Sequence, residues 1–135
     1  MPDAIAKVAW LRLDDGRILA ARTHGTAAFY LPGGKPEPGE SDEQALVREI
    51  GEELGVTLDP ATITPVLTVH APAHGKPPGS TVRLTCYAAG HTGIPAPGRE
   101  IAELAWLTHG DCGRVSPATA LVLDRLAAAD RLLRL

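Results

Sequence analysis

Hydrophobic and polar positions along this chain form several short apolar runs and two segments with helical spacing. The runs that predict β-strands span 4–13, 17–23, 29–31, 63–70, 81–89 and 101–107. Short apolar runs separated by Gly, Pro and Asp residues are typical of strands. Asp14, Asp15 and Gly16 lie between the first two runs and predict a hairpin turn.

The clearest helical segment lies between Ser41 and Gly55. Ser41 followed by Gln44 is a capping box, and Gly55 is placed to end the helix in the left-handed conformation. The apolar residues of the segment recur at about 100° per residue. They form a stripe predicted to pack on the sheet, which consists of Leu46, Val47, Ile50 and Leu54.

A second helix is predicted to begin at Ser116, with Pro117 in its first turn. Its apolar residues Leu121, Leu123 and Leu126 are expected to lie in the core. Trp106, in the run 101–107, is also expected to lie there. Strands flanked by two such helices indicate an α/β or α+β fold. The length of 135 residues fits a single domain over 1–135.

The composition narrows the classes of partner. A formal net charge of −3 provides no basic field for duplex nucleic acid. No apolar run reaches 18 residues, and Asp3 interrupts any leader, so we expect a cytoplasmic protein without membrane contact. Cys86 and Cys112 lack the spacing of metal ligands and are expected to be free thiols.

Three acidic residues share one face of the first helix. Glu49, Glu52 and Glu53 stand at i, i+3 and i+4, which brings their Cβ atoms within roughly 5–6 Å of one another. Like charges at this spacing repel, and acids near the C-terminal end of a helix are unfavourable. A hard divalent cation removes this cost, and oxygen ligands favour magnesium, manganese or calcium over zinc. The alternative is a solvated acidic face.

The segment before this helix, 31–40, contains three glycines and three prolines. This composition excludes a helix or a central strand, so a shaped loop is predicted. Gly33 and Gly34 allow the backbone to approach a ligand closely, and a carbonyl here can bind a cation. Lys35 can contact a phosphate or remain solvated.

Residues 34–56 read GKPEPGESDEQALVREIGEELGV. They match G-x5-E-x7-R-E-U-x-E-E-x-G-U, where U is aliphatic, at every specified position. Such a match arises by chance on the order of once in 10⁸ chains. This is the Nudix box, and the chain resembles the small, MutT-like members of the Nudix hydrolase family. The resemblance implies one Nudix domain with a mixed β-sheet sandwiched between α-helices, and hydrolysis of a nucleoside diphosphate linked to a group X.

The resemblance also implies roles for residues of the box. Mg²⁺, with Mn²⁺ as a substitute, would be held by the Gly34 carbonyl and by Glu49, Glu52 and Glu53. Arg48 would orient Glu49 through an ion pair. The general base is left open among Glu49, Glu53 and Glu100.

Many family members carry an acidic residue ahead of a Trp-bearing strand, where it acts as a further metal ligand or as the base. Glu100, six residues before Trp106, has the spacing of MutT-type members, and Glu103 is the competing candidate. The residues expected to bind substrate are Arg22, Phe29, Lys35 and Thr119.

Thr119 bears on the choice of substrate. It stands where MutT-type enzymes place an Asn that reads the purine edge, and a hydroxyl offers one donor where an amide offers two. This weakens the prediction of an oxidised-purine substrate. Pro72, sixteen residues past Val56, has the spacing found in members that act on ADP-ribose.

The predicted function is Mg²⁺-dependent hydrolysis of the pyrophosphate bond in a small-molecule nucleotide, by a monomer or homodimer. One alternative is MutT-type removal of oxidised nucleoside triphosphates. An alternative of another class is a non-catalytic, nucleotide-sensing Nudix domain, although such regulators usually have lost box glutamates or carry a DNA-binding segment. An isopentenyl diphosphate isomerase-like reaction would need a catalytic Cys and Glu in a longer chain.

Overall fold

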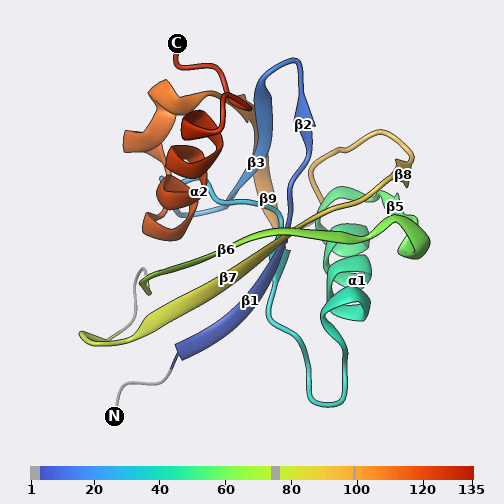
Figure 1. Cartoon of the computed structure of the whole chain (residues 1–135). Helices are drawn as coiled ribbons and strands as arrows, with labels where there is room; N and C mark the ends of the chain where they lie inside the picture. Colours follow the sequence, from blue (N-terminus) through green and yellow to red (C-terminus); the bar gives the residue numbers. More distant parts are fainter. Residues whose placement is uncertain (1–3, 74–76, 99) are drawn as a thin grey trace.

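The computed structural model describes residues 4–73, 77–98 and 100–135. Within these residues the largest sheet has four strands, in the order β4 (Gly33–Gly34), β1 (Ala4–Trp10), β7 (Thr81–Ala88) and β6 (Thr64–Pro72). β1 runs parallel to β7 and antiparallel to β4, and β6 runs antiparallel to β7. The sheet is therefore mixed (Figure 1).

Two smaller sheets complete the described strands. One contains β2 (Leu13–Asp14), β3 (Arg17–Thr23) and β9 (Ile101–Leu107), and the other pairs β5 (Thr57–Leu58) with β8 (His91–Thr92). The helices are α1 (Asp42–Leu54) and α2 (Pro117–Ala128), with the 3₁₀ segments η1 (Pro60–Thr62) and η2 (His109–Arg114).

The two helices cover opposite sides of the strands, as Figure 1 shows. Successive residues of β1 point to opposite faces. Val8 and Trp10 pack in the core beneath α1, whereas Ala9 and Leu11 pack in the core beneath α2. A mixed β-sheet sandwiched between α-helices, predicted from the sequence, is confirmed.

The predicted helix boundaries and hairpin are also confirmed. In α1, the Gln44 backbone N–H donates to Ser41 Oγ at 3.1 Å, and the Ser41 backbone N–H donates to Gln44 Oε1 at 2.9 Å. Gly55 ends the helix at φ 68°. Asp15 and Gly16 both have positive φ, at 53° and 75°, as a two-residue hairpin turn requires.

Several local predictions were wrong. Trp106 is 42% exposed, because it stands on β9 at the edge of its sheet, and Leu121 of α2 is also exposed. Residues 29–31 make isolated bridges rather than a strand, whereas Gly33–Gly34 pairs with β1 as a short strand. The first predicted strand divides into β1 and β2. The predicted irregular stretch 71–79 begins within β6, and its residues 74–76 lie outside the described part.

Within the described residues, no helix is both long enough and apolar enough to cross a membrane.

A pair of glycines in and after α1 offers a test of the helix boundary. Gly51 lies inside the helix, and an added Cβ would meet only the Val56 carbonyl oxygen, at 4.0 Å. Gly51→Ala should therefore raise the free energy of unfolding by about 0.5–1 kcal/mol. Gly55→Ala should lower it by about 1–2 kcal/mol, because Gly55 adopts φ 68°. Urea denaturation measures both, and shifts of the same sign would contradict the assigned helix end.

Candidate active site

The predicted acidic face of α1 lies beside the glycine pair of β4. Glu49 and Glu53 are partly buried, whereas the Glu52 side chain is 56% exposed. The opposite face of the helix anchors it in the core through Leu46, Ile50 and Leu54. Burial of this apolar stripe determines which way the carboxylates point.

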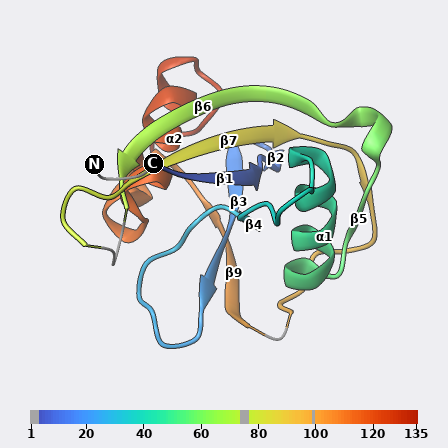
Figure 2. The same ribbon diagram turned by 90° about the horizontal axis from the view of Figure 1, so that it is seen from below.

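Gly33 leaves no room for any other residue, and Gly34 lies directly against the Glu49 side chain. A Cβ on Gly34 would lie 2.5 Å from the Glu49 carboxyl carbon. A Cβ on Gly33 would collide with the Val8 carbonyl oxygen of β1, to which this strand is paired. Figure 2 shows β4 running between β1 and α1. The glycine pair therefore lets the main chain pass directly against the carboxylates.

Glu53 is the most unusual of these acids. Burial raises its pKa to about 9, and the adjacent Glu49 adds to the shift through a shared hydrogen bond and its charge. The Gly33 N–H points at the Glu53 carboxylate and offsets only part of this rise in pKa. Glu53 Oε1 is buried without a hydrogen-bond partner. A buried acceptor in this state is costly unless something outside the chain satisfies it.

A divalent cation fits these residues. It would satisfy the unpartnered oxygen of Glu53 and offset the repulsion between Glu49 and Glu53. Glu52 lies on the same face of α1, and Gly34 brings main-chain atoms against Glu49. The donors are all oxygens, which suits Mg²⁺ or Mn²⁺.

Arg48 organises the solvent side of the cluster. Its Nη1 donates to Glu49 Oε1 at 2.7 Å, so the predicted ion pair between these residues is confirmed. Its Nε and Nη2 donate to the two carboxylate oxygens of Glu40, at 2.8 and 2.9 Å. These bonds from Arg48 lower the pKa of Glu40 to about 2.

The sequence analysis gave Glu40 no role, although it occupies a fixed position of the box. With Glu40 engaged on one edge of the guanidinium, Arg48 is held in the orientation that meets Glu49. The structure therefore places Glu40 as a support for Arg48.

Glu100 and Glu103 have different surroundings. The Glu103 side chain accepts a hydrogen bond from Arg22 Nε at 2.8 Å, and the two residues are directly opposite each other on β9 and β3. Glu100 is exposed, and its charge raises the pKa of both Glu53 and Tyr30. Of these two acids, Glu100 is the one that faces the carboxylate cluster.

Main-chain hydrogen bonds bring Glu100 to this position. α1 has no basic residue in its last turn. Its terminal carbonyls instead accept from the passing segment before β9: Ala96 N–H donates to Leu54 O, and Gly98 N–H donates to Glu53 O. The segment therefore supplies the donors that the helix end lacks, and Glu100 follows two residues later.

A cavity of about 360 Å³ adjoins the carboxylates. Gly33 and Gly34 form part of its wall, as does Tyr30. Burial raises the pKa of Tyr30, and so do the charges of Glu53, Glu100 and Glu49. Tyr30 therefore stands between the cavity and the acidic cluster. The sequence analysis had placed Phe29 rather than Tyr30 among the binding residues.

The remaining walls of the cavity combine apolar side chains with hydroxyls. The apolar contribution comes largely from Ile5, Leu31, Val82 and Leu84, and the hydroxyls include those of Ser116 and Thr119. Pro72 also lines the cavity. Such a lining, with few polar groups, is typical of a small-molecule site.

The four predicted substrate-binding residues fare differently. Thr119 lines the cavity, and its hydroxyl lies 2.9 Å from Ser116 Oγ. Phe29 is only 3% exposed, packs in the core and is not part of the wall of this cavity, so its contact with substrate stays a prediction. Arg22 is occupied by Glu103 and by the Thr26 carbonyl. Lys35 is exposed and lies outside the cavity wall.

The family of the chain follows from comparison with known proteins. A family model described as the NUDIX domain matches residues 2–126, nearly the whole chain. The chain belongs to the Nudix family. A crystal structure of the MutT Nudix hydrolase from Burkholderia pseudomallei has the same fold, with a TM-score of 0.73 and 25% identity, and the match covers 92% of this chain and 98% of that one.

Two of the sequence relatives match over shorter stretches. An RNA pyrophosphohydrolase from Tolumonas auensis is 41% identical over 49 residues, which are 36% of this chain and 28% of the relative. The 8-oxo-dGTP diphosphatase of Escherichia coli is 53% identical over 38 residues, 28% of this chain and 30% of that protein. The match to this chain thus spans less than a third of the length of each relative.

Because the Glu53 carboxyl is buried, we expect Glu53→Gln to stabilise the metal-free protein and to reduce the stabilisation that Mg²⁺ gives. Because its folded pKa, about 9, lies above the ordinary value of 4.5, the stability that Glu53 contributes is lost as pH rises through this interval. In EDTA at about pH 8, Glu53→Gln should therefore raise the thermal midpoint. In excess Mg²⁺ the wild type should gain roughly 2–3 kcal/mol at 100-fold over Kd, and the variant should gain far less.

Differential scanning fluorimetry in EDTA and in Mg²⁺ checks both parts. Glu43→Gln is the matched control, since Glu43 is an exposed acid on the same helix. An unchanged thermal midpoint on addition of metal, in the wild type and in Glu53→Gln alike, would show that the acidic face is merely solvated.

Proposed function

We propose that this Nudix protein hydrolyses the pyrophosphate bond of a nucleoside diphosphate linked to a further group X, with Mg²⁺ as cofactor and Mn²⁺ as a substitute. The observation that carries the proposal is the buried, unpartnered Glu53 Oε1 beside Glu49 and the glycine pair. A cation would satisfy this acceptor, and the cavity next to it can receive a small molecule.

Glu49, Glu52, Glu53, Glu100 and the Gly34 carbonyl are the ligands we assign to the cation. When bound, Mg²⁺ would supply positive charge to the diphosphate and polarise its phosphoryl oxygens, which makes phosphorus more open to attack. Arg48 fixes the Glu49 carboxylate, and Glu40 in turn fixes Arg48. This pre-organisation keeps the carboxylates from reorienting when the substrate binds.

Attack of water on phosphorus requires a base for its proton. Glu49, Glu53 and Glu100 are the candidates, since the charges of Glu49 and Glu100 both act on Glu53. Glu49 is hydrogen-bonded to Arg48, and Glu53 is buried against the glycine pair. Glu100 is exposed and faces the cluster, so we favour it as the group that accepts the proton. The products would be a nucleoside monophosphate and a phosphorylated X.

The cavity favours binding of the organic part of the substrate. Its volume of about 360 Å³ falls at the lower end of the range of small-molecule sites. Tyr30 joins the cavity to the carboxylates, so a nucleoside in the cavity would present its phosphates toward Glu53 and Glu100. We also propose that Lys35, which is exposed and follows Gly34, contacts a phosphate of the bound substrate.

The relatives support the class of reaction more than the substrate. One is named an RNA pyrophosphohydrolase and another an 8-oxo-dGTP diphosphatase, and both names describe cleavage of a phosphoric anhydride. Thr119 lines the cavity with its hydroxyl close to that of Ser116, so part of its hydrogen-bonding capacity is used within the chain. We therefore rank oxidised-purine sanitation second. Pro72 in the cavity wall is consistent with an ADP-ribose-like X.

A non-catalytic sensor is the alternative of another class. All box glutamates are present, and the approach of Glu49 to Gly34 and of Glu53 to Gly33 supports a metal site rather than a sensor. A substrate screen distinguishes a hydrolase from a sensor. The panel contains nucleoside triphosphates, oxidised nucleotides, nucleotide sugars, ADP-ribose and dinucleoside polyphosphates. We expect hydrolysis in Mg²⁺ that Glu53→Gln abolishes and Glu43→Gln preserves. Nucleotide binding without turnover would favour the sensor.

Glu100 and Glu103 form a matched pair for testing the base. Glu100→Gln should lower kcat by about 10²-fold or more with an unchanged fold, because it removes the proton acceptor. Glu103→Gln should change kcat by less than about fivefold, since it only breaks an exposed ion pair with Arg22. Steady-state kinetics with circular dichroism as the folding control measures both, and the reverse ranking would overturn the assignment.

Selectivity for the oxidised base tests the role of Thr119. Without an amide to read the purine edge, the protein should prefer 8-oxo-dGTP over dGTP by less than about 10²-fold in kcat/KM. Thr119→Asn should raise this ratio, and Thr119→Ser is the control that keeps a hydroxyl. A wild-type preference of about 10⁴ or more would show that other residues read the oxidised base, and oxidised-purine sanitation would then rank first.

A further inference from the structure

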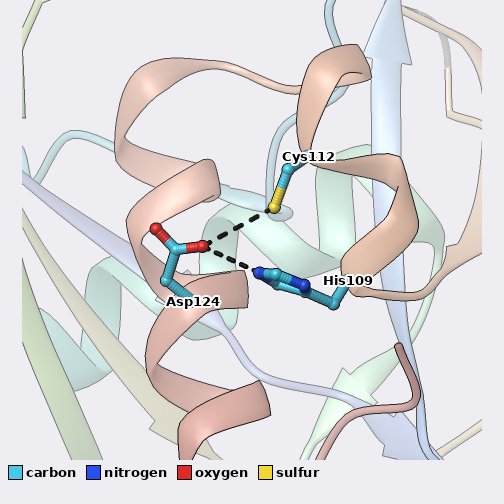
Figure 3. Close-up of side chains that lie close together, drawn as sticks. All are labelled: His109, Cys112 and Asp124. Atoms are coloured by element: carbon cyan, nitrogen blue, oxygen red, sulfur yellow. Dashed lines mark hydrogen bonds and ion pairs between the residues drawn. The ribbon is translucent and has the colours of Figure 1, made fainter. Parts of the chain in front are cut away.

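A second group of potential metal ligands lies where η2 meets α2, apart from the carboxylates of α1. His109 and Cys112 come from η2, and Asp124 comes from α2 (Figure 3). His109 Nε2 lies 2.8 Å from Asp124 Oδ1, and Cys112 Sγ lies 3.8 Å from the same oxygen. The three ligand atoms all fall within 4.8 Å of one another.

We propose that His109, Cys112 and Asp124 form a binding site for Zn²⁺ that is independent of the Mg²⁺ site. An imidazole nitrogen, a thiolate sulfur and a carboxylate oxygen are the three donor types that Zn²⁺ takes in proteins. The sulfur excludes Mg²⁺ as the preferred ion, because hard cations select oxygen. A neutral imidazole, a thiolate and a carboxylate also balance the charge of one Zn²⁺.

The geometry needs only small side-chain adjustments. Ligand atoms of a tetrahedral zinc ion lie about 3.3–3.8 Å apart, given bond lengths of about 2.0–2.3 Å. The Cys112–Asp124 separation of 3.8 Å already suits this arrangement. His109 and Asp124, 2.8 Å apart, would separate by about 0.5 Å as the cation replaces the proton that they share.

The local backbone holds two of the ligands in register. His109 and Cys112 are at i and i+3 of a 3₁₀ helix, where side chains three residues apart project from the same side. A reciprocal pair of bonds between Thr108 and Asp111 closes the start of η2. Asp111 also binds Arg114, at 2.8 Å, so its carboxylate is already committed. Water is the natural fourth ligand, since Asp124 and His109 are both partly exposed.

Binding here would act on the wall of the substrate cavity. η2 leads directly into Ser116 and the first turn of α2, where Ser116, Pro117, Ala118 and Thr119 line the cavity. A metal bridging η2 and α2 would cross-link the two elements on either side of this turn. The proposed ion thus has a stabilising role at a distance from the carboxylates of α1.

Cobalt provides a direct test on the folded protein. We use Glu53→Gln with a non-chelating reductant, so that the carboxylate site contributes little. One equivalent of Co²⁺ should produce the near-ultraviolet absorption of a thiolate–cobalt bond, and Zn²⁺ should remove it. Cys112→Ser should abolish the band, and His109→Gln and Asp124→Asn should weaken Co²⁺ binding by at least about tenfold. Cys86→Ser, a change at the fully buried cysteine, should leave the absorption band unchanged.

Alkylation gives a second measurement that needs no substitution. Cys112 is partly exposed and Cys86 is buried, so iodoacetamide should modify Cys112 first. Excess Zn²⁺ should slow this modification at least about tenfold, as expected for a thiolate held by metal. Absence of the cobalt band, its persistence in Cys112→Ser, unchanged affinity in Asp124→Asn, or unprotected alkylation would each overturn the proposal. The cluster would then be only an ion pair beside a thiol.

Discussion

The structure around the candidate active site depends on holding two carboxylates together near the C-terminal end of a helix. Glu49 and Glu53 repel each other there, and the position near the negative end of the helix dipole is itself unfavourable. Three features of the fold offset this charge repulsion and the unfavourable helix dipole. Arg48 holds Glu49, the Gly33 N–H points at Glu53, and the apolar stripe of α1 fixes the helix in the core. One buried oxygen is still left without a partner, and this residual cost is what a bound cation would remove.

The end of α1 connects this cluster to the rest of the site. Because the last turn carries no basic side chain, its carbonyls take their hydrogen bonds from the main chain of the segment before β9. Main-chain donors differ in effect from a Lys or Arg side chain in the helix itself. They bring a second stretch of chain to the helix end and place Glu100 where its charge acts on Glu53 and Tyr30. The satisfaction of helix-end carbonyls thus contributes to the electrostatics of the site.

Much of this could be predicted from the sequence, because the signals are local. The capping box, Gly55 and the i, i+3, i+4 acids of α1 all depend on neighbours within one or two turns. The errors concern contacts between distant segments. The pairing of Arg22 with Glu103 depends on the register of β3 and β9, and the exposure of Trp106 depends on β9 being an edge strand. Neighbouring residues of an extended segment face opposite ways, so Phe29 and Tyr30 cannot both reach the cavity, and only packing decides which of them does.

Cys112 illustrates the same limit for metal ligands. In the sequence it stands in a polar stretch, twelve residues from Asp124 and without a second cysteine at zinc-site spacing. The 3₁₀ geometry of η2 places it on the side of His109, and the packing of α2 then adds Asp124. Ligand softness separates this group from the carboxylates of α1, since one contains sulfur and nitrogen and the other only oxygen. The two proposed metal sites would thus differ in the ion that they prefer, and the second is connected to the wall of the cavity through the turn between η2 and α2.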